Sequence, residues 1–398
     1  MRRLLPIILF CCALAAYARN SLPQWRKGEL EIHHINTCRG ECTFFVFPDG
    51  TTMLLDAGNA KMEKESEYLV PRVEVTPEEK IISYVRSVMP LHKDSIDYLV
   101  VSNFNAGQIG GLDAKTSHTE ARKPDYFLSG VTYVCESLKF RKLIDRGFPL
   151  YDYPVQNLSV EAKNYVNFIR YQTQHNHLSA ERFNVGKVNQ IKLLHDVRGY
   201  QRYFRVYNLA ANGIVWTGKG LDCIPFYSLK HNFKYLKNEN TSSIAMRINY
   251  GKFSYYTGAD LSGDIEEQKD EVTTIDSFVG RICGKVSVCK ANDGASVFTN
   301  SLDFTNAVKA DDYIVMPWKT SHLDPNVMER LAKLEEGAKK PHIFVTSLPE
   351  KYLPQNNRYM WGEYISPSTG HVVVKVSNKG KSYKIYIVDD NKNILSQY

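Results

Sequence analysis

Beyond its N-terminus, the chain lacks any apolar run long enough to cross a bilayer, because each later run is short and interrupted by charge. It also lacks repeats of roughly 20–50 residues and low-complexity segments, which excludes solenoid and fibrous architectures. Dense blocks of Lys and Arg are missing, so the net charge of +7 indicates an ordinary solvated surface and gives no strong sign of nucleic-acid binding. The 398 residues, 43% of them apolar, are ample for a large buried core.

Several catalytic motifs are also missing or incomplete. No G-x-S-x-G nucleophile elbow occurs. Segment 213–219 has P-loop spacing, but Gly220 stands where Ser or Thr should bind Mg²⁺, and the apolar residues of the segment predict a strand. Ser287 and Lys290 have S-x-x-K spacing without the other motifs of penicillin-binding enzymes. The sequence therefore indicates neither an activated serine nor a P-loop nucleotide site.

The N-terminus has the pattern of a secretion signal. Arg2 and Arg3 precede an apolar run over residues 4–16, which leads into the small-x-small triplet 16–18. This pattern predicts a signal peptide, residues 1–18, that is cleaved after Ala18. The mature chain is then expected to be a single domain, residues 19–398, in the periplasm or the medium.

A lipid anchor at Cys11 or Cys12 is the alternative, and it is disfavoured because Phe10 stands where a small residue should precede a lipidated Cys11. Cleavage would leave six of the eight cysteines and lower the net charge from +7 to +5. In an exported protein these cysteines could form bridges, although buried free thiols fit equally well. The two close pairs are Cys38 with Cys42 and Cys283 with Cys289.

Secondary-structure patterns indicate an α/β chain in which strands outnumber helices. A helix is expected from Pro77, because Thr76 and Glu79 form a capping box and apolar residues follow at helical spacing. A second helix is expected from Pro325 through Leu334. Mixed short strands and helices predict a layered domain with largely antiparallel sheets. The expected strands are 30–35, 43–47, 52–55, 96–101, 243–249, 253–256, 312–316, 342–346, 371–376 and 383–388.

Five segments, in order, resemble the metallo-β-lactamase superfamily, and especially its bacterial branch that is similar to the hydrolase domain of ComEC-type competence proteins. Together they extend over roughly residues 29–346. The resemblance implies a four-layer αββα sandwich with its site at the strand ends. The segments are 47–58, 102–111, 238–242, 256–261 and 290–296.

The second segment resembles the family motif Ser/Thr-His-x-His-x-Asp-His-x-Gly-Gly, with its serine and glycines kept and its ligands replaced. Asn103 and Asn105 stand at two metal-binding histidine positions, Gly107 at the catalytic aspartate and Gln108 at the last histidine. Amide oxygens are poor substitutes for imidazole at a zinc ion, and glycine offers no side-chain ligand. The resemblance therefore implies that the usual metal site is lost.

The remaining site positions carry only part of the family pattern. In the fifth segment Asp293 and Gly294 replace a pair of histidines. Asp260 and Asp56 match acidic positions, and the resemblance gives Asp56 a mainly structural role. We expect no metal, no cofactor and no catalytic residue. The vestigial binding pocket is expected to consist of Asn103, Asn105, Gln108, Asp260 and Asp293.

Two alternatives could restore a metal. The site could be rebuilt with relocated histidines, although such spacings are commonly incidental. We interpret His322 as a residue held by local hydrogen bonds before the helix at Pro325. The oxygen donors of the pocket could also bind Ca²⁺ or Mg²⁺, but only Asp260 and Asp293 are carboxylates. The candidate histidines are His33, His34, His175, His177, His195, His231 and His322.

Three functional hypotheses follow. The first is an exported pseudo-enzyme that binds a ligand or a protein of the cell envelope without catalysis. The second is a hydrolase with a rebuilt site that uses Asp260, Asp293 and a relocated histidine. The third is a structural envelope protein, which a closed pocket near Asn103 would favour, whereas a deep open cleft would favour ligand binding.

Overall fold

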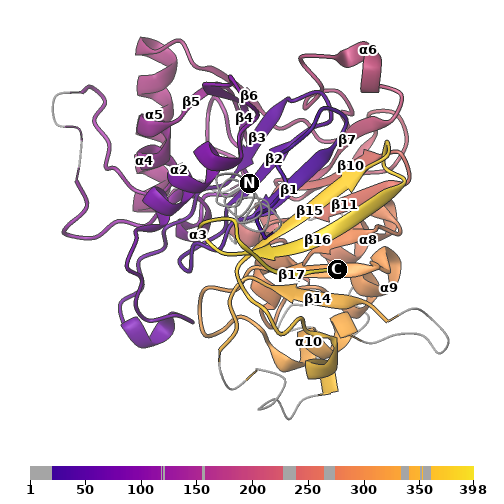
Figure 1. Cartoon of the computed structure of the whole chain (residues 1–398). Coiled ribbons are helices and arrows are strands. Elements are labelled where there is room, and N and C mark those ends of the chain that lie inside the picture. The colour runs from indigo at the N-terminus through magenta and orange to yellow at the C-terminus, as the bar shows by residue number, and fades with distance from the viewer. Residues whose placement is uncertain are drawn as a thin grey trace, which may run out of the picture.

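The computed structural model (Figure 1) describes residues 20–117, 119, 122–154, 157–226, 239–263, 274–332, 340–349, 352 and 360–398. Two large β-sheets form its framework, with helices around them. The expected signal peptide lies outside the described residues, as do His231, Asn238 and Leu334.

The first sheet has nine strands, and the expected strands 43–47 and 52–55 form a β-hairpin in it. Its pairs are antiparallel from β17 to β3 and parallel from β3 to β6. In spatial order the strands are β17 (Ile394–Gln397), β16 (Ser382–Val388), β15 (His371–Ser377), β1 (Leu30–His34), β2 (Thr43–Val46), β3 (Thr52–Leu55), β4 (Ser95–Val101), β5 (Lys139–Asp145) and β6 (Ser179–Arg182).

The second sheet has eight strands. Its pairs are parallel from β14 to β11 and antiparallel from β11 to β9. In spatial order the strands are β14 (His342–Val345), β13 (Asp312–Val315), β12 (Val288–Lys290), β11 (Phe253–Thr257), β10 (Ala245–Tyr250), β7 (Phe204–Ala211), β8 (Ile214–Trp216) and β9 (Cys223–Pro225). Strand β8 lies where the sequence predicted a strand in place of a P-loop.

Both sheets are mixed, so the expected antiparallel pairing describes only part of each. Every step between neighbouring parallel strands contains a helix, because a parallel pair needs a crossover connection. These crossovers contain α2 (Pro77–Val88), α3 (Ala106–Ile109), α4 (Val131–Ser137) and α5 (Val160–His175) in the first sheet, and α8 (Ile275–Cys283), α9 (Leu302–Val308) and α10 (Pro325–Ala332) in the second. The remaining short helices are α6 (Val197–Tyr200), η1 (Glu65–Glu67), η3 (Glu239–Ser242), η4 (Asn292–Ala295) and η6 (Met360–Tyr364).

Alternating strand residues produce three apolar layers. Phe45 of the first sheet and Ile314 of the second belong to the core between the sheets. Their neighbours point outward, so that Phe44 packs with α2, α4 and α5, while Tyr313 packs with α8, α9 and α10. Helix, sheet, sheet and helix layers therefore follow one another, which confirms the predicted αββα sandwich.

Helix α2 begins as the sequence predicted. The Thr76 hydroxyl accepts a hydrogen bond from the Glu79 backbone N–H at 3.3 Å, and the Glu79 carboxylate accepts one from the Thr76 N–H at 3.3 Å. The predicted apolar face is buried against the first sheet. Local capping and periodicity were sufficient to place this element.

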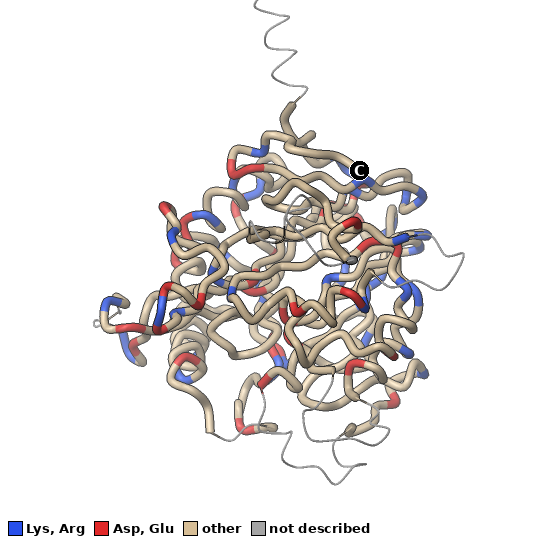
Figure 2. The backbone as a smooth tube through the Cα atoms, turned by 90° about the horizontal axis from the view of Figure 1, so that it is seen from below, with Lys and Arg blue, Asp and Glu red and all other residues tan. Residues whose placement is uncertain are grey.

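Figure 2 shows Lys and Arg interspersed with Asp and Glu along the described backbone. In that part of the chain, no helix is long and apolar enough to span a membrane. The six cysteines of the expected mature chain are all free thiols here, namely Cys38, Cys42, Cys135, Cys223, Cys283 and Cys289.

Candidate functional site

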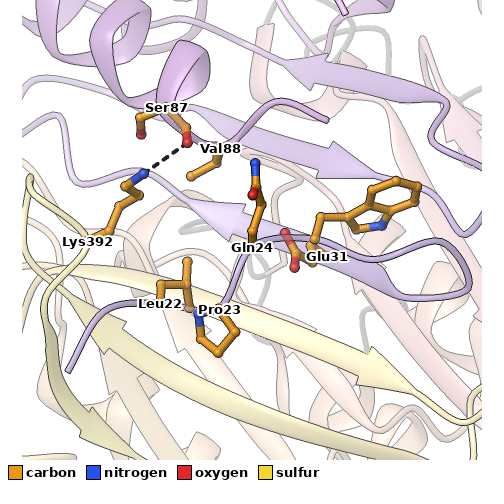
Figure 3. A pocket seen from close by; sticks show the side chains of 8 residues that line it. Leu22, Pro23, Gln24, Glu31, Ser87, Val88 and Lys392 are labelled. Atoms are coloured by element: carbon orange, nitrogen blue, oxygen red, sulfur yellow. Dashed lines mark hydrogen bonds between the residues drawn. The ribbon is translucent and has the colours of Figure 1, made fainter. Parts of the chain in front are cut away.

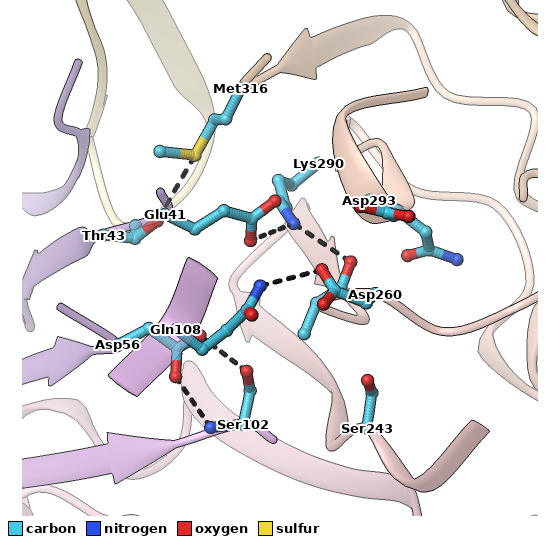
Figure 4. Close-up of polar contacts among 12 residues, drawn as sticks. Glu41, Thr43, Asp56, Ser102, Gln108, Ser243, Asp260, Lys290, Asp293 and Met316 are labelled. Carbon is cyan, nitrogen blue, oxygen red and sulfur yellow. Dashed lines mark hydrogen bonds and ion pairs between the residues drawn. The ribbon is translucent and has the colours of Figure 1, made fainter. Parts of the chain in front are cut away.

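The predicted pocket residues gather where strands of both sheets end, and Figure 4 shows Gln108, Asp260 and Asp293 among them. Asn103 and Asn105 follow β4, Asp260 follows β11, and Asp293 follows β12. The backbone N–H of Asp293 donates to the carbonyl of Ala259 at 2.9 Å, which joins the two acidic segments. Loops that are far apart in the sequence therefore form one polar centre.

Three side-chain amides donate hydrogen bonds to the carboxylate of Asp260. Its Oδ2 accepts from Nδ2 of Asn103 at 3.2 Å and from Nδ2 of Asn105 at 3.0 Å. Its Oδ1 accepts from Nε2 of Gln108, in α3, at 2.8 Å. Asn103, Gln108 and Asp260 are each at most 4% exposed. Both oxygens of a buried carboxylate are thus bound by protein donors.

Neighbouring groups fix the orientation of these amides. The backbone N–H of Asn105 donates to Oδ1 of Asn103 at 2.9 Å, so the NH₂ group of Asn103 must face Asp260 and Ser243. The NH₂ group of Asn105 also donates to Oδ1 of Asn240 at 2.7 Å. A buried N–H without an acceptor costs about 1–3 kcal/mol, which disfavours flipping either amide.

A lysine supplies positive charge beside this network. Nζ of Lys290 lies 2.5 Å from Oε2 of Glu41 and donates to the carbonyl of Ala259 at 3.1 Å. Lys290 and Glu41 are both buried. Lys290 belongs to the fifth resembling segment, but the resemblance gave it no role, and nothing in the sequence marked Glu41.

Burial raises the pKa of three carboxyl groups in this centre. The pKa of Glu41 rises to about 8 because burial outweighs the attraction of Lys290. The pKa of Asp56 rises to about 7 and that of Asp260 to about 6, with repulsion from Asp293 adding to the effect at Asp260. The centre therefore holds protons at pH values where exposed carboxyl groups are ionised.

Asp56 connects two strand ends. Its Oδ1 accepts from the backbone N–H of Ser102 at 2.7 Å, and its Oδ2 accepts from the Ser102 hydroxyl at 2.6 Å. These contacts fix the start of the loop that carries Asn103. The geometry agrees with the structural role that the resemblance implied for Asp56.

Asp293 belongs to the centre but does not join the amide network. Its Oδ1 lies 3.1 Å from Nε2 of His322 and 3.4 Å from Nζ of Lys319, and its Oδ2 accepts from the Ser296 hydroxyl at 2.7 Å. Burial alone would raise the pKa of Asp293, but the hydrogen bond from His322 and the charge of Lys319 lower it below its ordinary value.

The interpretation of His322 needs correction. Besides a local bond from the Trp318 N–H to its Nδ1 at 3.2 Å, it contacts the site residue Asp293 through Nε2. The ring is fully buried, and burial lowers its pKa. Because Nδ1 accepts, Nε2 must donate, so the ring is neutral and both nitrogens are occupied.

Four of the other candidate histidines form hydrogen bonds with residues outside the site. His33 bonds to Tyr84 and Glu31, and His34 bonds to Tyr255 and the Val372 carbonyl. His195 contacts Lys93 and Asp97, and His175 contacts the carbonyl of Lys123.

The residues present do not fit the metal site of the resembling family. Amide NH₂ groups of Asn103, Asn105 and Gln108 point toward Asp260, where a cation would need oxygen or nitrogen lone pairs. Two buried acceptors, Oε1 of Glu41 and Oε1 of Gln108, have no hydrogen-bond partner, but they do not supply the three or more ligands of a metal site. Within the described residues, no group of three His, Cys, Asp or Glu side chains could hold a metal ion.

An ion pair that sequence analysis missed anchors the Asn103 loop. Glu239 accepts from the backbone N–H of Phe104 at 2.7 Å and from Nε of Arg146 at 2.7 Å. The Arg146 guanidinium is 4.1 Å from the centroid of the Phe104 ring and is almost fully buried. The adjacent polar segment was visible in the sequence, but the partner of Glu239 was not.

A separate pocket of about 170 Å³ lies between the N-terminal segment, the end of α2 and Lys392 (Figure 3). Lys392 crosses it and donates to the Ser87 carbonyl at 3.0 Å. Glu31 also lines it, but its carboxylate already pairs with Lys375 and His33. Ligand sites usually enclose roughly 300–1,000 Å³, so this pocket is small for an organic ligand.

Comparisons with protein families and with curated proteins find no match. Solved structures with a similar fold include CmlA, a diiron β-hydroxylase from Streptomyces venezuelae, at 10% identity and a TM-score of 0.39 over 78% of this chain and 49% of CmlA. Zn²⁺-bound PqqB from Methylobacterium extorquens has 10% identity and a TM-score of 0.41 over 84% of this chain and 87% of PqqB.

A long-form RNase Z from yeast has 8% identity and a TM-score of 0.34, over 80% of this chain and 41% of the RNase. The chain thus spans about half the length of CmlA and less than half of this RNase Z. These proteins have the metallo-β-lactamase fold. At such identities the similarity concerns the fold alone.

Proposed function

We propose that this protein is an exported, metal-free pseudo-enzyme of the metallo-β-lactamase superfamily, whose polar centre has become a structural element. The observation that carries this proposal is the carboxylate of Asp260, which receives three amide donors directly. The resemblance of the sequence motifs supports the ComEC-type branch, and the N-terminal pattern supports export.

Amide donors and Lys290 take over the electrostatic task that metal ions perform in the resembling family. A rise in the pKa of Asp260 from 3.8 to about 6 corresponds to about 3 kcal/mol that disfavours its ionised form. A hydrogen bond to a charged group contributes about 1.5–3 kcal/mol. The hydrogen bond from Asn105 and the charge of Lys290 already lower this pKa, so the amide donors and Lys290 offset part of the cost of burying the carboxylate.

The burial of the centre favours a structural role over ligand binding in this pocket. Asn103 and Gln108 are almost fully buried, and Asp260 and Asp293 are less than 10% exposed. A ligand would have to displace direct protein–protein hydrogen bonds to reach them. We therefore assign any binding of an envelope partner to the outer surface of the sandwich.

No observation favours the hydrolase alternative. A general base needs a free lone pair within reach of water or substrate. Nδ1 of His322 accepts from Trp318 and its Nε2 donates to Asp293, so neither nitrogen is available.

Metal analysis of the purified mature protein tests the proposal. We expect less than stoichiometric zinc, iron and manganese after dialysis, an unchanged melting temperature with a chelator, and no turnover of phosphodiesters, esters or lactams. Stoichiometric retained metal, or chelator-sensitive turnover, would overturn it. N-terminal sequencing of protein from the exporting cell tests export separately, because cleavage after Ala18 leaves Arg19 as the first residue.

A further inference from the structure

Trp318 occupies the space beside Gly107, the position of the family's aspartate in the resembling motif. A Cβ atom added at Gly107 would lie 2.9 Å from Cζ2 of Trp318. Real Cβ atoms essentially never approach so closely, so a side chain at position 107 and the Trp318 ring exclude each other. Gly107 lies in α3 and has no left-handed backbone conformation that would itself require glycine.

His322 lies against Gly294, the other glycine at a family ligand position, although Gly294 also has a left-handed backbone (φ 55°) that by itself favours glycine. A Cβ atom added at Gly294 would lie 2.3 Å from Nδ1 of His322. Both aromatic rings come from the turn between β13 and α10. That turn is fastened to the neighbouring loop, because the Leu323 N–H donates to the Gly294 carbonyl at 3.1 Å.

The turn is also held from its other side. Trp318 is 8% exposed and packs with Ala60 and Tyr68. Its carbonyl accepts from the Leu69 N–H at 3.0 Å. The two rings are thus fixed parts of the interior that border the polar centre at Gly107 and at Asp293.

We infer that the rings of Trp318 and His322, here called the aromatic plug, occupy the space that ligand side chains at positions 107 and 294 would take. The aromatic plug thereby keeps the polar centre closed to ions and ligands. This goes beyond the proposed function, because it assigns closure to a second loop that carries none of the replaced ligands. Gly107 is then required by its neighbour Trp318 and not by its own backbone.

A double-mutant cycle tests the inference, because the effect of Gly107→Ala on the melting temperature should change sign when the Trp318 ring is removed. With Trp318 present, Gly107→Ala is expected to lower the melting temperature by roughly 2–6 °C, because the added methyl group overpacks the site. In a Trp318→Leu background, which lacks the distal ring atoms, the same Gly107→Ala change is expected to raise the melting temperature, because alanine favours a helix over glycine.

Trp216→Ala serves as the matched control, because Trp216 stacks on Tyr207 in the second sheet and does not touch Gly107. Gly107→Ala should remain destabilising in that background. Trp318→Phe provides a milder second background if Trp318→Leu fails to fold, and it should reduce the loss. An equal loss from Gly107→Ala with and without the Trp318 ring would overturn the inference, and so would a gain with the ring present.

Discussion

Glu41 should make the free energy of unfolding fall as pH rises from 5 to 8, although buried histidines with lowered pKa values, such as His322, act in the opposite direction below pH 6.5. Burial raises the pKa of Glu41 from 4.5 to about 8. A carboxyl group with a raised folded-state pKa stabilises the fold fully below its unfolded pKa and loses that contribution as pH rises through the folded pKa. The sign is therefore opposite to that of an ordinary surface ion pair.

The size of this effect follows from the same shift. Each pKa unit corresponds to about 1.4 kcal/mol, so Glu41 contributes a loss of up to about 1.4 kcal/mol per pH unit between its two pKa values. Glu41→Gln removes this titration and keeps an oxygen that can accept from Lys290. From pH 5 to pH 8, the unfolding free energy of the native protein should fall relative to that of the variant by about 4 kcal/mol.

Urea unfolding of both proteins at pH 5, 6, 7 and 8 measures this difference. Glu65→Gln, at an exposed position, controls for the general loss of a carboxylate. A difference that stays constant over this range would refute the reasoning. A difference that grows in favour of the native protein would mean that the ion pair with Lys290 outweighs burial.

Two other substitutions test the supports of the site and the fold. Arg146→Met should lower the unfolding free energy by about 3 kcal/mol, because it leaves the Glu239 carboxylate without its buried partner. The control Arg141→Met, at an exposed position, should change the unfolding free energy by less than about 0.5 kcal/mol. Equal effects of the two substitutions would contradict the assignment. Thr76→Ala should lower it by about 1 kcal/mol through loss of the α2 cap, as measured by urea unfolding, and an unchanged value would show that the capping box does not contribute.

Local patterns predicted those parts of the fold that depend on neighbouring residues. The capping box at Thr76 and the strand expected over residues 43–47 are set by residues a few positions apart, and both appear in the structure. The convergence of Asn103, Asn105 and Gln108 on Asp260 followed from the order of the resembling segments. Helix α5 was missed, although its apolar residues recur at helical spacing.

Long-range pairings could not be predicted. Lys290 and Glu41 are 249 residues apart, and neither carries a local signature of the other. The contact between His322 and Asp293 depends on how the turn after β13 packs, which periodicity does not describe. From the sequence alone, His322 could equally form local hydrogen bonds or contact the site, because the choice depends on where the neighbouring loop lies.

Anomalous diffraction tests the central claim most directly. Crystals grown with zinc and manganese should show no anomalous peak between Asn103, Gln108 and Asp260, and the amide nitrogens should lie within hydrogen-bonding distance of the carboxylate. A peak at that point, with the amide groups turned away from Asp260, would contradict the account.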